Sequence, residues 1–276
     1  MKTTFRLFII FTILSMLCFS CKCTKSLSST KGADNYFELT QIITDSLFNS
    51  NQIISLIKLQ NNPKNKYKIE IGYKKSELKV TSYFGESENA MAAINGSFFD
   101  MDKGGSVTYL ELNDSVINNT RSSKLKWGVS DSLINGAIVF NKNNNIEIQP
   151  RMPDHFYNLS KKEQAVMATG PLLIYKVERS SLPNLEFVHK RHPRTCLCKT
   201  EESILFITVD GRSTNAQGMN LYELQDFLLA FGCKDAINLD GGGSTTMWTH
   251  DKGIVNFPSD KSGQRPVANA LLIKKE

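Results

Sequence analysis

The feature that most constrains the fold is a succession of short apolar runs, each interrupted by polar, glycine-rich or asparagine-rich residues. Residues 67–73 and 78–84 alternate between apolar and polar side chains, a pattern typical of strands with one buried face. Residues 91–94 and 203–209 are apolar almost without a break, as expected for strands that are buried on both faces. Most of the segments are therefore predicted to be β-strands.

The breaks between the runs indicate how neighbouring strands connect. Residues 141–145 are rich in asparagine, which tolerates left-handed backbone conformations, so they predict a hairpin between strands at 136–140 and 146–149. Further strands are expected at 165–177, where Gly170-Pro171 interrupts the run, at 235–239, at 245–249 and 253–257 as a second hairpin, and at 267–273.

One stretch has helical periodicity instead. Residues 221–231 carry apolar side chains three and four positions apart, which makes one apolar stripe along a helix. Asn220 and Glu223 have the spacing of a capping box, and Gly232 follows as a left-handed stop. Together the patterns predict a single α+β domain over residues 36–276, in which a mixed, mostly antiparallel β-sheet core carries a few helices.

The N-terminal segment differs from the rest of the chain. Lys2 and Arg6 precede an apolar run over residues 7–19, which is too short and too one-sidedly flanked for a membrane-spanning helix. This arrangement predicts that residues 1–20 are a secretory signal peptide. We therefore expect the protein to be exported to a bacterial cell envelope.

The end of the apolar run, residues 18–21, resembles a bacterial lipoprotein cleavage box. Cys21 would then carry a lipid, and this anchor would be the protein's only contact with a membrane, in the periplasm or at the outer surface. The alternative is an ordinary signal peptide cut near Ser20, which leaves Cys21 as a plain thiol. Residues 21–35 lack apolar periodicity and predict a flexible tether that leads to the folded domain.

The charge balance says what the chain is not expected to bind. The 33 Lys and Arg residues exceed the 27 Asp and Glu residues by six, without a basic run interleaved with aromatic residues. Nucleic acid is therefore not expected as a partner. An anionic ligand would have to be bound by a few well-placed arginines, because the overall charge is too small to attract it strongly.

The cysteines of the domain are expected to be structural. Cys196 and Cys198 lie two apart in a predicted strand, so they face the same side and cannot easily bond to each other. Either could pair with Cys233, but three unpaired thiols in the core is the preferred interpretation. A zinc site would need a fourth ligand, which is not nearby in the sequence, so no metal and no cofactor is expected.

The most informative string is Asp240-Gly241-Gly242-Gly243-Ser244-Thr245-Thr246, which follows the predicted strand that carries Asn238. Three consecutive glycines weaken folding through backbone entropy, unless an unusual conformation or a close approach requires them. Such a turn can direct its N–H groups at an anion, and the three hydroxyls could bind phosphate or sugar. A mobile loop is the alternative, which the framing carboxylate and hydroxyls argue against.

Three further polar motifs follow predicted strands or loops. Asp210-Gly211-Arg212 comes directly after the strand at 203–209 and by itself would be an ordinary turn. Arg191-His192-Pro193-Arg194-Thr195 supplies two guanidinium groups, which can bind phosphate oxygens, and an imidazole that titrates near neutral pH. His192 alone is more often structural than catalytic. Asn95-Gly96-Ser97 closes the strand at 91–94 with polar groups.

In their order along the chain, these motifs are similar to those of the phosphodiester glycosidase family. The resemblance covers residues 90–273, and residues before Tyr67 resemble nothing familiar. Some family members remove N-acetylglucosamine from a phosphodiester, and others are exported bacterial proteins. The matching strings are Ala93-Ile94-Asn95-Gly96-Ser97-Phe98-Phe99, Thr169-Gly170-Pro171-Leu172-Leu173, Arg191-His192-Pro193-Arg194-Thr195, Val209-Asp210-Gly211-Arg212, Gly218-Met219, Asn238-Leu239-Asp240-Gly241-Gly242-Gly243-Ser244-Thr245-Thr246-Met247 and Arg265-Pro266-Val267-Ala268-Asn269-Ala270.

The resemblance implies hydrolysis of the bond between a sugar anomeric carbon and a phosphate oxygen, with release of free sugar. Asp240 and Asp210 would stabilise positive charge on the sugar and activate water, and His192 would carry a proton. Arg194 and Arg265 would stabilise the departing phosphate, assisted by the glycine-loop N–H groups. The expected substrate-binding residues are Asn95, Arg194, Thr195, Arg212, Asn238, Gly241, Gly242, Gly243, Ser244, Thr245 and Arg265.

A second hypothesis uses the same residues without catalysis. A surface lipoprotein that binds phosphorylated glycans or polysaccharide would need the arginines and the glycine loop, but it would gain nothing from two carboxylates beside an anion. The sequence therefore favours the enzyme.

Overall fold

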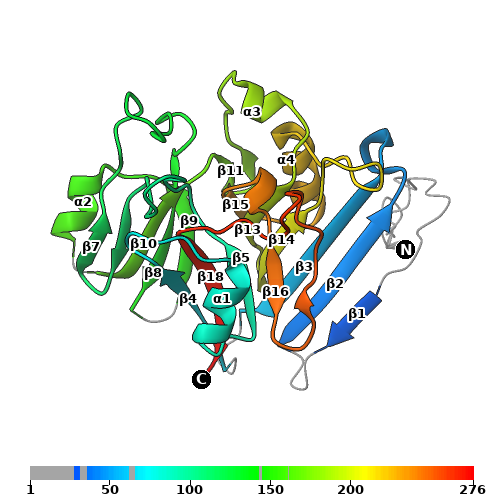
Figure 1. The fold of residues 1–276 in the computed structure, drawn as a ribbon, viewed down its shortest axis with the longest axis horizontal. Coiled ribbons are helices and arrows are strands. Elements are labelled where there is room, and N and C mark those ends of the chain that lie inside the picture. Colours follow the sequence, from blue (N-terminus) through cyan, green and yellow to red (C-terminus); the bar gives the residue numbers. More distant parts are fainter. Residues whose placement is uncertain (1–27, 32–35, 62–65, 143–144, 161) are drawn as a thin grey trace, which may run out of the picture.

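Three antiparallel sheets form the framework of the described residues (Figure 1). The computed structural model describes residues 28–31, 36–61, 66–142, 145–160 and 162–276. The expected signal peptide and Cys21 lie outside these residues. No helix in the described ranges is long and apolar enough to cross a membrane.

The largest sheet has eight strands in the order β1-β2-β3-β14-β13-β15-β11-β12. These strands are β1 Ser28–Lys31, β2 Phe37–Thr44, β3 Gln52–Gln60, β11 Leu172–Tyr175, β12 Glu178–Arg179, β13 Arg194–Lys199, β14 Ser203–Val209 and β15 Asp235–Asn238.

Two five-stranded sheets have the orders β7-β6-β10-β8-β9 and β17-β16-β5-β18-β4. The first consists of β6 Leu110–Leu112, β7 Ser115–Asn118, β8 Gly136–Asn141, β9 Ile146–Pro150 and β10 Glu163–Thr169. The second consists of β4 Tyr67–Tyr73, β5 Ala92–Asn95, β16 Met247–Thr249, β17 Gly253–Ile254 and β18 Asn269–Lys275.

Four short helices cover the sheets: α1 Thr81–Ser87, α2 Asp154–Leu159, α3 Glu186–His189 and α4 Leu221–Ala230. Two 3-10 turns, η1 Leu47–Asn49 and η2 Gly242–Ser244, complete the regular elements. The paired strands are antiparallel, so the predicted α+β class with a mostly antiparallel core is confirmed.

The eight-stranded sheet is buried on both faces by its alternating side chains. In β14, Ile204 and Phe206 join a core shared by all three sheets, whereas Leu205 and Ile207 join a second core on the opposite face. Helix α4 covers that second face with a stripe that includes Leu224. This burial on both sides explains why residues 203–209 form one continuous apolar run.

Helix α4 begins and ends as the local sequence predicts. The Asn220 side chain accepts a hydrogen bond from the Glu223 backbone N–H at 2.9 Å, and the Glu223 carboxylate accepts one from the Asn220 N–H at 3.0 Å. This pair is the predicted capping box. Gly232 has φ +77°, the left-handed conformation expected of a helix stop.

The prediction of a strand at residues 78–84 is wrong, because helix α1 begins at Thr81. Phe84 packs with Trp248 in a separate core, and Gly85 lies so close to the Trp248 ring that any side chain there would overlap it. This tertiary contact outweighs the short alternating pattern, which by itself indicates a strand only weakly.

The N-terminal part of the domain holds two strands that the sequence did not single out. Strand β3 pairs with β14 from Ile54 to Gln60 and is central to the sheet, and β2 pairs with β3. Ser28–Lys31 forms edge strand β1, so the expectation of a flexible tether does not hold for these four residues. Edge pairing needs only backbone hydrogen bonds, which a Ser- and Lys-rich composition does not reveal.

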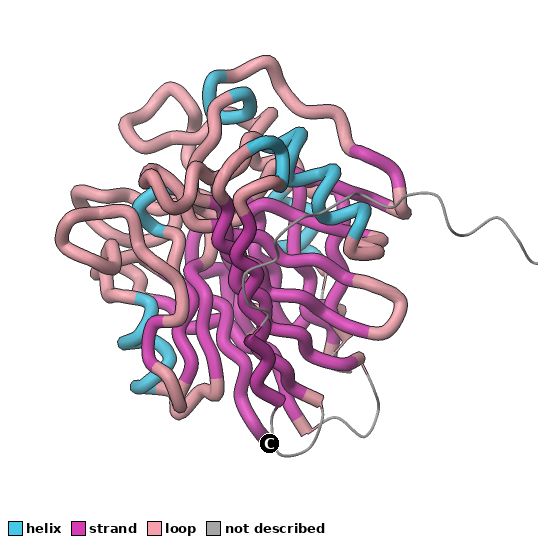
Figure 2. Tube along the Cα trace, turned by 90° about the vertical axis from the view of Figure 1, so that its right-hand side faces the viewer, coloured by secondary structure: helices cyan, strands magenta, loops and turns pink. Residues whose placement is uncertain are grey.

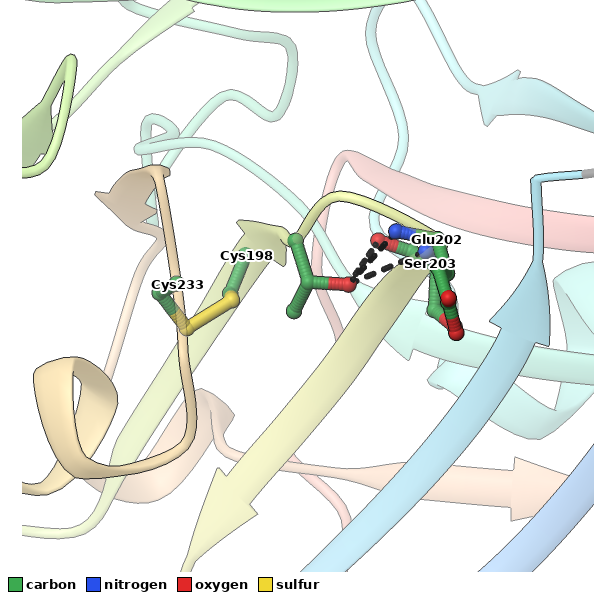
Figure 3. The surroundings of a disulfide bond; sticks show 5 residues. Cys198, Glu202, Ser203 and Cys233 are labelled. Atoms are coloured by element: carbon green, nitrogen blue, oxygen red, sulfur yellow. Dashed lines mark hydrogen bonds between the residues drawn. A yellow bond between two sulfur atoms is a disulfide. The ribbon is translucent and has the colours of Figure 1, made fainter. Parts of the chain in front are cut away.

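A disulfide joins Cys198 at the end of β13 to Cys233, which follows α4 (Figure 3). Cys196 remains a buried free thiol. The expectation of three unpaired thiols is therefore wrong for two of them. The reason is tertiary, because α4 packs across β13 and brings Cys233 to within 5.7 Å of Cys198, Cα to Cα.

We expect the Cys198→Ser/Cys233→Ser double variant to unfold at a lower denaturant concentration. The bond closes a loop between positions 35 residues apart, so its loss should cost about 3–4 kcal/mol by the chain-entropy estimate. Urea unfolding followed by circular dichroism measures the change. A Cys196→Ala variant is the matched control, because it should keep the wild-type sensitivity to reductant. Equal midpoints for oxidised and reduced wild type would contradict the prediction.

Candidate functional site

The candidate site forms where polar residues at several strand ends meet. Antiparallel pairing sets Arg194 at the start of β13 opposite Val209 at the end of β14, so Asp210 follows directly. Strands β5 and β18 pair Asn95 with Ala270 in the second five-stranded sheet. In Figure 2 most of the long loops gather at the end of the molecule away from the C-terminus, which is the end where β18 begins.

Asn95 ties these strand ends together. Its Nδ2 donates to the Asp240 carbonyl at 2.6 Å, and its Oδ1 accepts from the Thr195 hydroxyl at 2.8 Å and from the Thr246 N–H at 3.1 Å. The side chain is fully buried, so all of these bonds are shielded from water. Asn95 and Thr195 thus position the glycine loop, and binding of substrate by the Asn95 amide stays a prediction.

The glycine loop, residues 240–246, is held by backbone bonds to two distant segments. The Asp240 N–H donates to the Gly96 carbonyl at 3.0 Å, and the Gly242 N–H donates to the Pro193 carbonyl at 2.9 Å. A Cβ atom on Gly241 would lie 2.8 Å from the Pro193 carbonyl oxygen. The first glycine is therefore required by close backbone packing.

Three charged groups lie against the next two glycines. A Cβ atom on Gly242 would lie 2.9 Å from Nη2 of Arg212, and one on Gly243 would overlap both the Arg265 guanidinium and the Asp260 carboxylate. The predicted close approach is confirmed, but the approaching groups are side chains of this same chain. Two guanidinium groups therefore lie directly against the backbone of the glycine loop.

The expected anion-binding role of the loop N–H groups is contradicted for most of them. The Gly241 N–H donates to Oδ1 of Asp240 at 3.0 Å, and the Gly242 N–H is used by Pro193. The Ser244 and Thr245 N–H groups donate within the loop, at 3.2 Å each. Because these donors already have acceptors, the loop offers side chains rather than backbone to a ligand.

Asp240 is half-buried at the start of the loop. Burial raises the pKa of its carboxyl to about 6, while the Ser244 hydroxyl, the charge of Arg265 and the Gly241 N–H oppose the rise. Asp240 therefore titrates close to neutral pH and lies near a cation. These are properties of a carboxylate that can act as a base.

Asp210 differs from Asp240 in access. It is only 2% exposed, and its carboxylate accepts from Asn256 Nδ2 at 3.0 Å and from the Phe257 N–H at 3.1 and 3.2 Å. Burial raises its pKa to about 6, although both hydrogen bonds lower it. This carboxylate holds residues 256 and 257 in place and has little surface left for a ligand.

Arg212 is the accessible guanidinium of the site. Its backbone has φ 62°, a left-handed conformation that is uncommon for a side chain of this size and is typical of functional positions. The residue is exposed, and its Nη1 lies 3.5 Å from the Ser259 hydroxyl, at the outer limit of a hydrogen bond. It forms no ion pair with any described residue.

Arg265 is held by a carboxylate that the sequence did not single out. Its Nε donates to Oδ2 of Asp260 at 2.8 Å, and its Nη2 donates to Oδ1 at 3.1 Å. Both side chains are about one quarter exposed. Asp260, Asn256 and Ser259 belong to one loop, residues 256–265, which touches Asp210, Arg212 and the glycine loop.

Sequence reasoning missed that loop because its residues have the composition of an ordinary polar connection. The sequence offered one weak signal of this ion pair, because Asp260 lies five positions before Arg265. The partners of the loop are far away in the sequence, so only the fold reveals them.

Arg194 lies behind the site and is fully buried. Its Nε donates to the Met219 carbonyl and its Nη2 to the carbonyls of Phe187 and Lys190, each at 2.8 Å. The Phe187 ring lies 4.6 Å from the guanidinium carbon. Burial lowers its pKa to about 9. The prediction that Arg194 contacts the phosphate is not supported by this geometry, which instead makes it a clamp on α3.

Arg191, the other arginine of that motif, is also occupied. It forms an ion pair with Glu223 and donates to the Phe48 carbonyl at 2.8 Å. His192 has a buried Nδ1 without a partner among the described residues, and burial, followed by the charges of Arg194 and Arg212, lowers its pKa. His192 is therefore uncharged at neutral pH.

The remaining predicted residues line the interior of the loop. Asn238 is buried and donates to the Gly170 carbonyl at 2.9 Å, so it positions the neighbouring turn. The Ser244 side chain is buried beside Asp240, and the Thr245 hydroxyl is buried without a partner among the described residues. The structure brings Asn238, Ser244 and Thr245 to the site but does not expose them.

Two other features bear on the kind of site. The described residues contain no group of three or more His, Cys, Asp or Glu side chains arranged to hold a metal ion. A groove of about 360 Å³ lies between Glu38, Lys58 and Phe231, at the end of β3 and β14 opposite to Asp210. Its lining includes none of the candidate-site residues, so it is a separate feature.

Residues 88–274 match the model of the family described as phosphodiester glycosidase. An uncharacterized prophage-derived protein of Bacillus subtilis, YomE, is 27% identical over 216 residues, which make up 73% of this chain and 32% of that protein. The bovine N-acetylglucosamine-1-phosphodiester alpha-N-acetylglucosaminidase is 42% identical over 57 residues, 21% of this chain and 10% of the bovine protein. The chain thus spans about a third of YomE and about a tenth of the bovine relative.

Solved structures are similar in fold. The catalytic domain of the zebrafish N-acetylglucosamine-1-phosphodiester alpha-N-acetylglucosaminidase, auto-inhibited by its pro-peptide, superposes with a TM-score of 0.65 at 18% identity, covering 92% of this chain and 89% of that one. A hypothetical protein from Synechocystis gives a TM-score of 0.71 at 12% identity, covering 91% and 64% of the two chains. At these identities the likeness concerns the fold.

We expect Gly243→Ala to leave the fold intact and to raise the pKa of Asp240. The added Cβ must displace the ends of the Arg265 and Asp260 side chains, which can move, and Arg265 lowers that pKa in the wild type. Carboxyl carbon NMR during a pH titration measures the shift. Gly232→Ala is the matched control, since it meets no atom within 4 Å and should cost only about 1 kcal/mol of left-handed strain. An unchanged Asp240 titration in Gly243→Ala would contradict the prediction.

Proposed function

Because the chain belongs to the phosphodiester glycosidase family, we propose that it hydrolyses the bond between a sugar anomeric carbon and a phosphate oxygen in a sugar-1-phosphodiester. The products are the free sugar and a phosphomonoester. The bovine relative is named for action on an N-acetylglucosamine-1-phosphodiester, so N-acetylglucosamine is the first sugar to test.

The observation that carries the proposal is one titratable carboxylate beside two guanidinium groups on a single loop. Asp240 begins the glycine loop, Arg212 lies against Gly242, and Arg265 is near enough to lower the pKa of Asp240. A sugar joined to phosphate needs this combination, since a carboxylate must face the sugar while a cation faces the phosphate. A site for phosphate alone would gain nothing from Asp240.

The reaction follows from these positions. As the bond between the anomeric carbon and the phosphate oxygen breaks, the bonding electrons pass to the phosphate oxygen, and the Arg212 guanidinium stabilises the negative charge. Positive charge develops on the sugar, which the ionised Asp240 stabilises. Water then adds to the anomeric carbon and gives its proton to Asp240, which yields the free sugar. Phosphate is a good leaving group, so little general-acid help is needed.

The other residues position this pair. Asp210 fixes the loop that carries Asp260 and Arg265, and Asn95 fixes the backbone of Asp240. The two aspartates therefore have different roles in the proposed mechanism: Asp240 contacts the reacting atoms, and Asp210 holds the wall beside them. His192, uncharged at neutral pH, lies next to the arginines and is not needed for a proton transfer in this sequence of steps.

We also propose that the protein acts outside the cytoplasm, anchored at the bacterial cell envelope through Cys21. The Cys198–Cys233 disulfide supports an oxidising compartment, because such bonds form and persist mainly in exported proteins. The proposal rests otherwise on the apolar segment at residues 7–19. Metabolic labelling with a palmitate analogue, compared between wild type and Cys21→Ser, tests the anchor.

We expect Asp240→Asn to reduce kcat/KM for a sugar-1-phosphodiester by roughly 10²–10⁴-fold, the usual contribution of such a group. The wild-type rate should fall as the pH falls through about 6, because protonation removes the negative charge that Asp240 supplies. Release of free sugar, measured across pH 4.5–8.5, gives both results. A rate that rises as the pH falls through 6 would show that the protonated carboxyl acts. Asp226→Asn, an exposed aspartate paired with Arg179, is the control and should keep wild-type activity.

We expect Arg212→Ala to reduce kcat/KM by roughly 10²–10³-fold through loss of charge stabilisation on the leaving phosphate. Arg212→Lys should recover only part of this, because lysine keeps the charge but loses the planar pair of donors. Arg179→Ala removes an exposed guanidinium far from the glycine loop and serves as the control. Wild-type kinetics in Arg212→Ala would refute the assignment of the phosphate to this residue.

The binding hypothesis is tested by the same assays. A non-catalytic surface protein would bind a sugar phosphodiester through Arg212 and release no sugar over any range of pH. Turnover in the wild type and its loss in Asp240→Asn would show that the protein is an enzyme and would reject the binding hypothesis.

A further inference from the structure

The two guanidinium groups on the glycine loop are not equivalent in charge. Arg265 forms a two-point ion pair with Asp260, at 2.8 and 3.1 Å, so its charge is largely balanced. Arg212 forms no ion pair with any residue in the described part of the chain. Arg212 is therefore the guanidinium at this loop that has no carboxylate partner among the described residues, while Asp240 adds a second negative charge to the loop when it is ionised.

The Asp260 carboxylate belongs to the site because of where it lies. Both of its oxygens fall on the position that a side chain at Gly243 would occupy, in the middle of the glycine loop. Its partner Arg265 is close enough to Asp240 to lower the pKa of that carboxyl. A phosphate that contacts Arg212 above Gly242 would thus lie one residue away from a fixed negative charge.

An ion pair at this exposure is not needed for stability. Pairs between partly exposed side chains contribute little to folding, since solvent screens them and the side chains lose freedom. Arg265 could therefore rest on Gly243 without a carboxylate partner at small cost to the fold. The presence of Asp260 is better explained by the effect of its negative charge on which ligands the site binds.

Substrate and product of the proposed reaction differ in charge at this point. A phosphodiester carries a single negative charge at every pH above about 2, whereas a phosphomonoester has a second pKa near 6 and carries close to two charges at pH 8. The extra charge appears on the oxygen that formed the bond to the sugar, next to Asp240 and Arg265.

We infer that Asp260 makes the site select singly charged phosphodiesters and repel doubly charged phosphomonoesters, which also speeds release of the product. The inference rests on the proposed function for the identity of substrate and product. It adds a residue that determines specificity through charge: one unbalanced guanidinium matches one negative charge, and the second charge of a monoester meets the Asp260 carboxylate. Repulsion of like charges in a partly exposed site is large enough to affect binding by roughly tenfold.

The test uses methyl phosphate and dimethyl phosphate as probes, titrated into the full purified protein and followed by NMR. The pH is held at 8, so that methyl phosphate carries two charges and both site aspartates are ionised. Wild type should bind dimethyl phosphate more tightly than methyl phosphate. Asp260→Asn should tighten methyl phosphate by about tenfold and dimethyl phosphate by less than about threefold. Asp226→Asn makes the same change in net charge far from the loop and should alter neither.

The outcomes separate this inference from the proposed function. If Asp260→Asn weakens both probes equally, Asp260 serves only to position Arg265 and the inference is wrong. If neither probe binds the wild type, the inference is also wrong. If the charge preference shifts as expected but the wild type releases no sugar from any phosphodiester, the hydrolase proposal fails while the selectivity remains. Hydrolysis with product inhibition by methyl phosphate that is the same in wild type and Asp260→Asn would reject the inference alone.

Discussion

The buried amide of Asn95 is the interaction on which the rest of the site depends. One side chain joins β5, β13 and the glycine loop through three hydrogen bonds, and it does so at 0% exposure. A buried amide with any of these bonds missing would cost about 1–3 kcal/mol, so the two sheets must keep this register for the amide to be satisfied. Asp240 takes its position from that register, since its carbonyl is one of the three partners. The catalytic assignment therefore begins with a residue that positions the glycine loop.

The glycine loop shows how close packing and charge combine. Its three glycines allow the Pro193 carbonyl, Arg212 and Arg265 to come within van der Waals contact of the backbone, and each approach belongs to a different segment of the chain. Arg212 and Arg265 thus lie directly against the loop backbone, where Arg265 is also paired with Asp260 and Arg212 reaches the Ser259 hydroxyl. A side chain at Gly243 would overlap the Arg265 and Asp260 side chains and would have to displace them, and a displacement of about an ångström is enough to affect catalysis strongly. The packing around the three glycines therefore determines where the charged groups of the site lie.

Structural features that depend only on neighbouring residues could be predicted from the sequence, and features that depend on contacts between distant residues could not. The ends of α4 follow from Asn220 and Gly232, because capping needs only neighbouring residues. The glycine loop stood out because three glycines demand a close approach. Which groups approach it was not predictable, since Asp260 looks like any loop residue. The role predicted for Arg194 depends on the fold in the same way, because a guanidinium has the same chemistry in a motif whether the fold exposes it or, as here, buries it against Phe187.

Burial raises the pKa of Asp210 and of Asp240 to the same value, so the pKa alone does not distinguish a catalytic carboxylate from a structural one. The distinction comes from the use of the oxygen atoms. Asp210 spends its oxygens on Asn256 and the Phe257 backbone, whereas Asp240 is half-buried, and its neighbours are a hydroxyl, a backbone N–H and a cation. Fixed donors hold the charge of a carboxylate constant when the charge of a ligand changes. A carboxylate that is accessible to the ligand on one side can gain or lose a proton in response. Asp210 is therefore suited to hold residues 256 and 257 and Asp240 to the base role proposed for it, and the difference between them lies in access rather than in acidity.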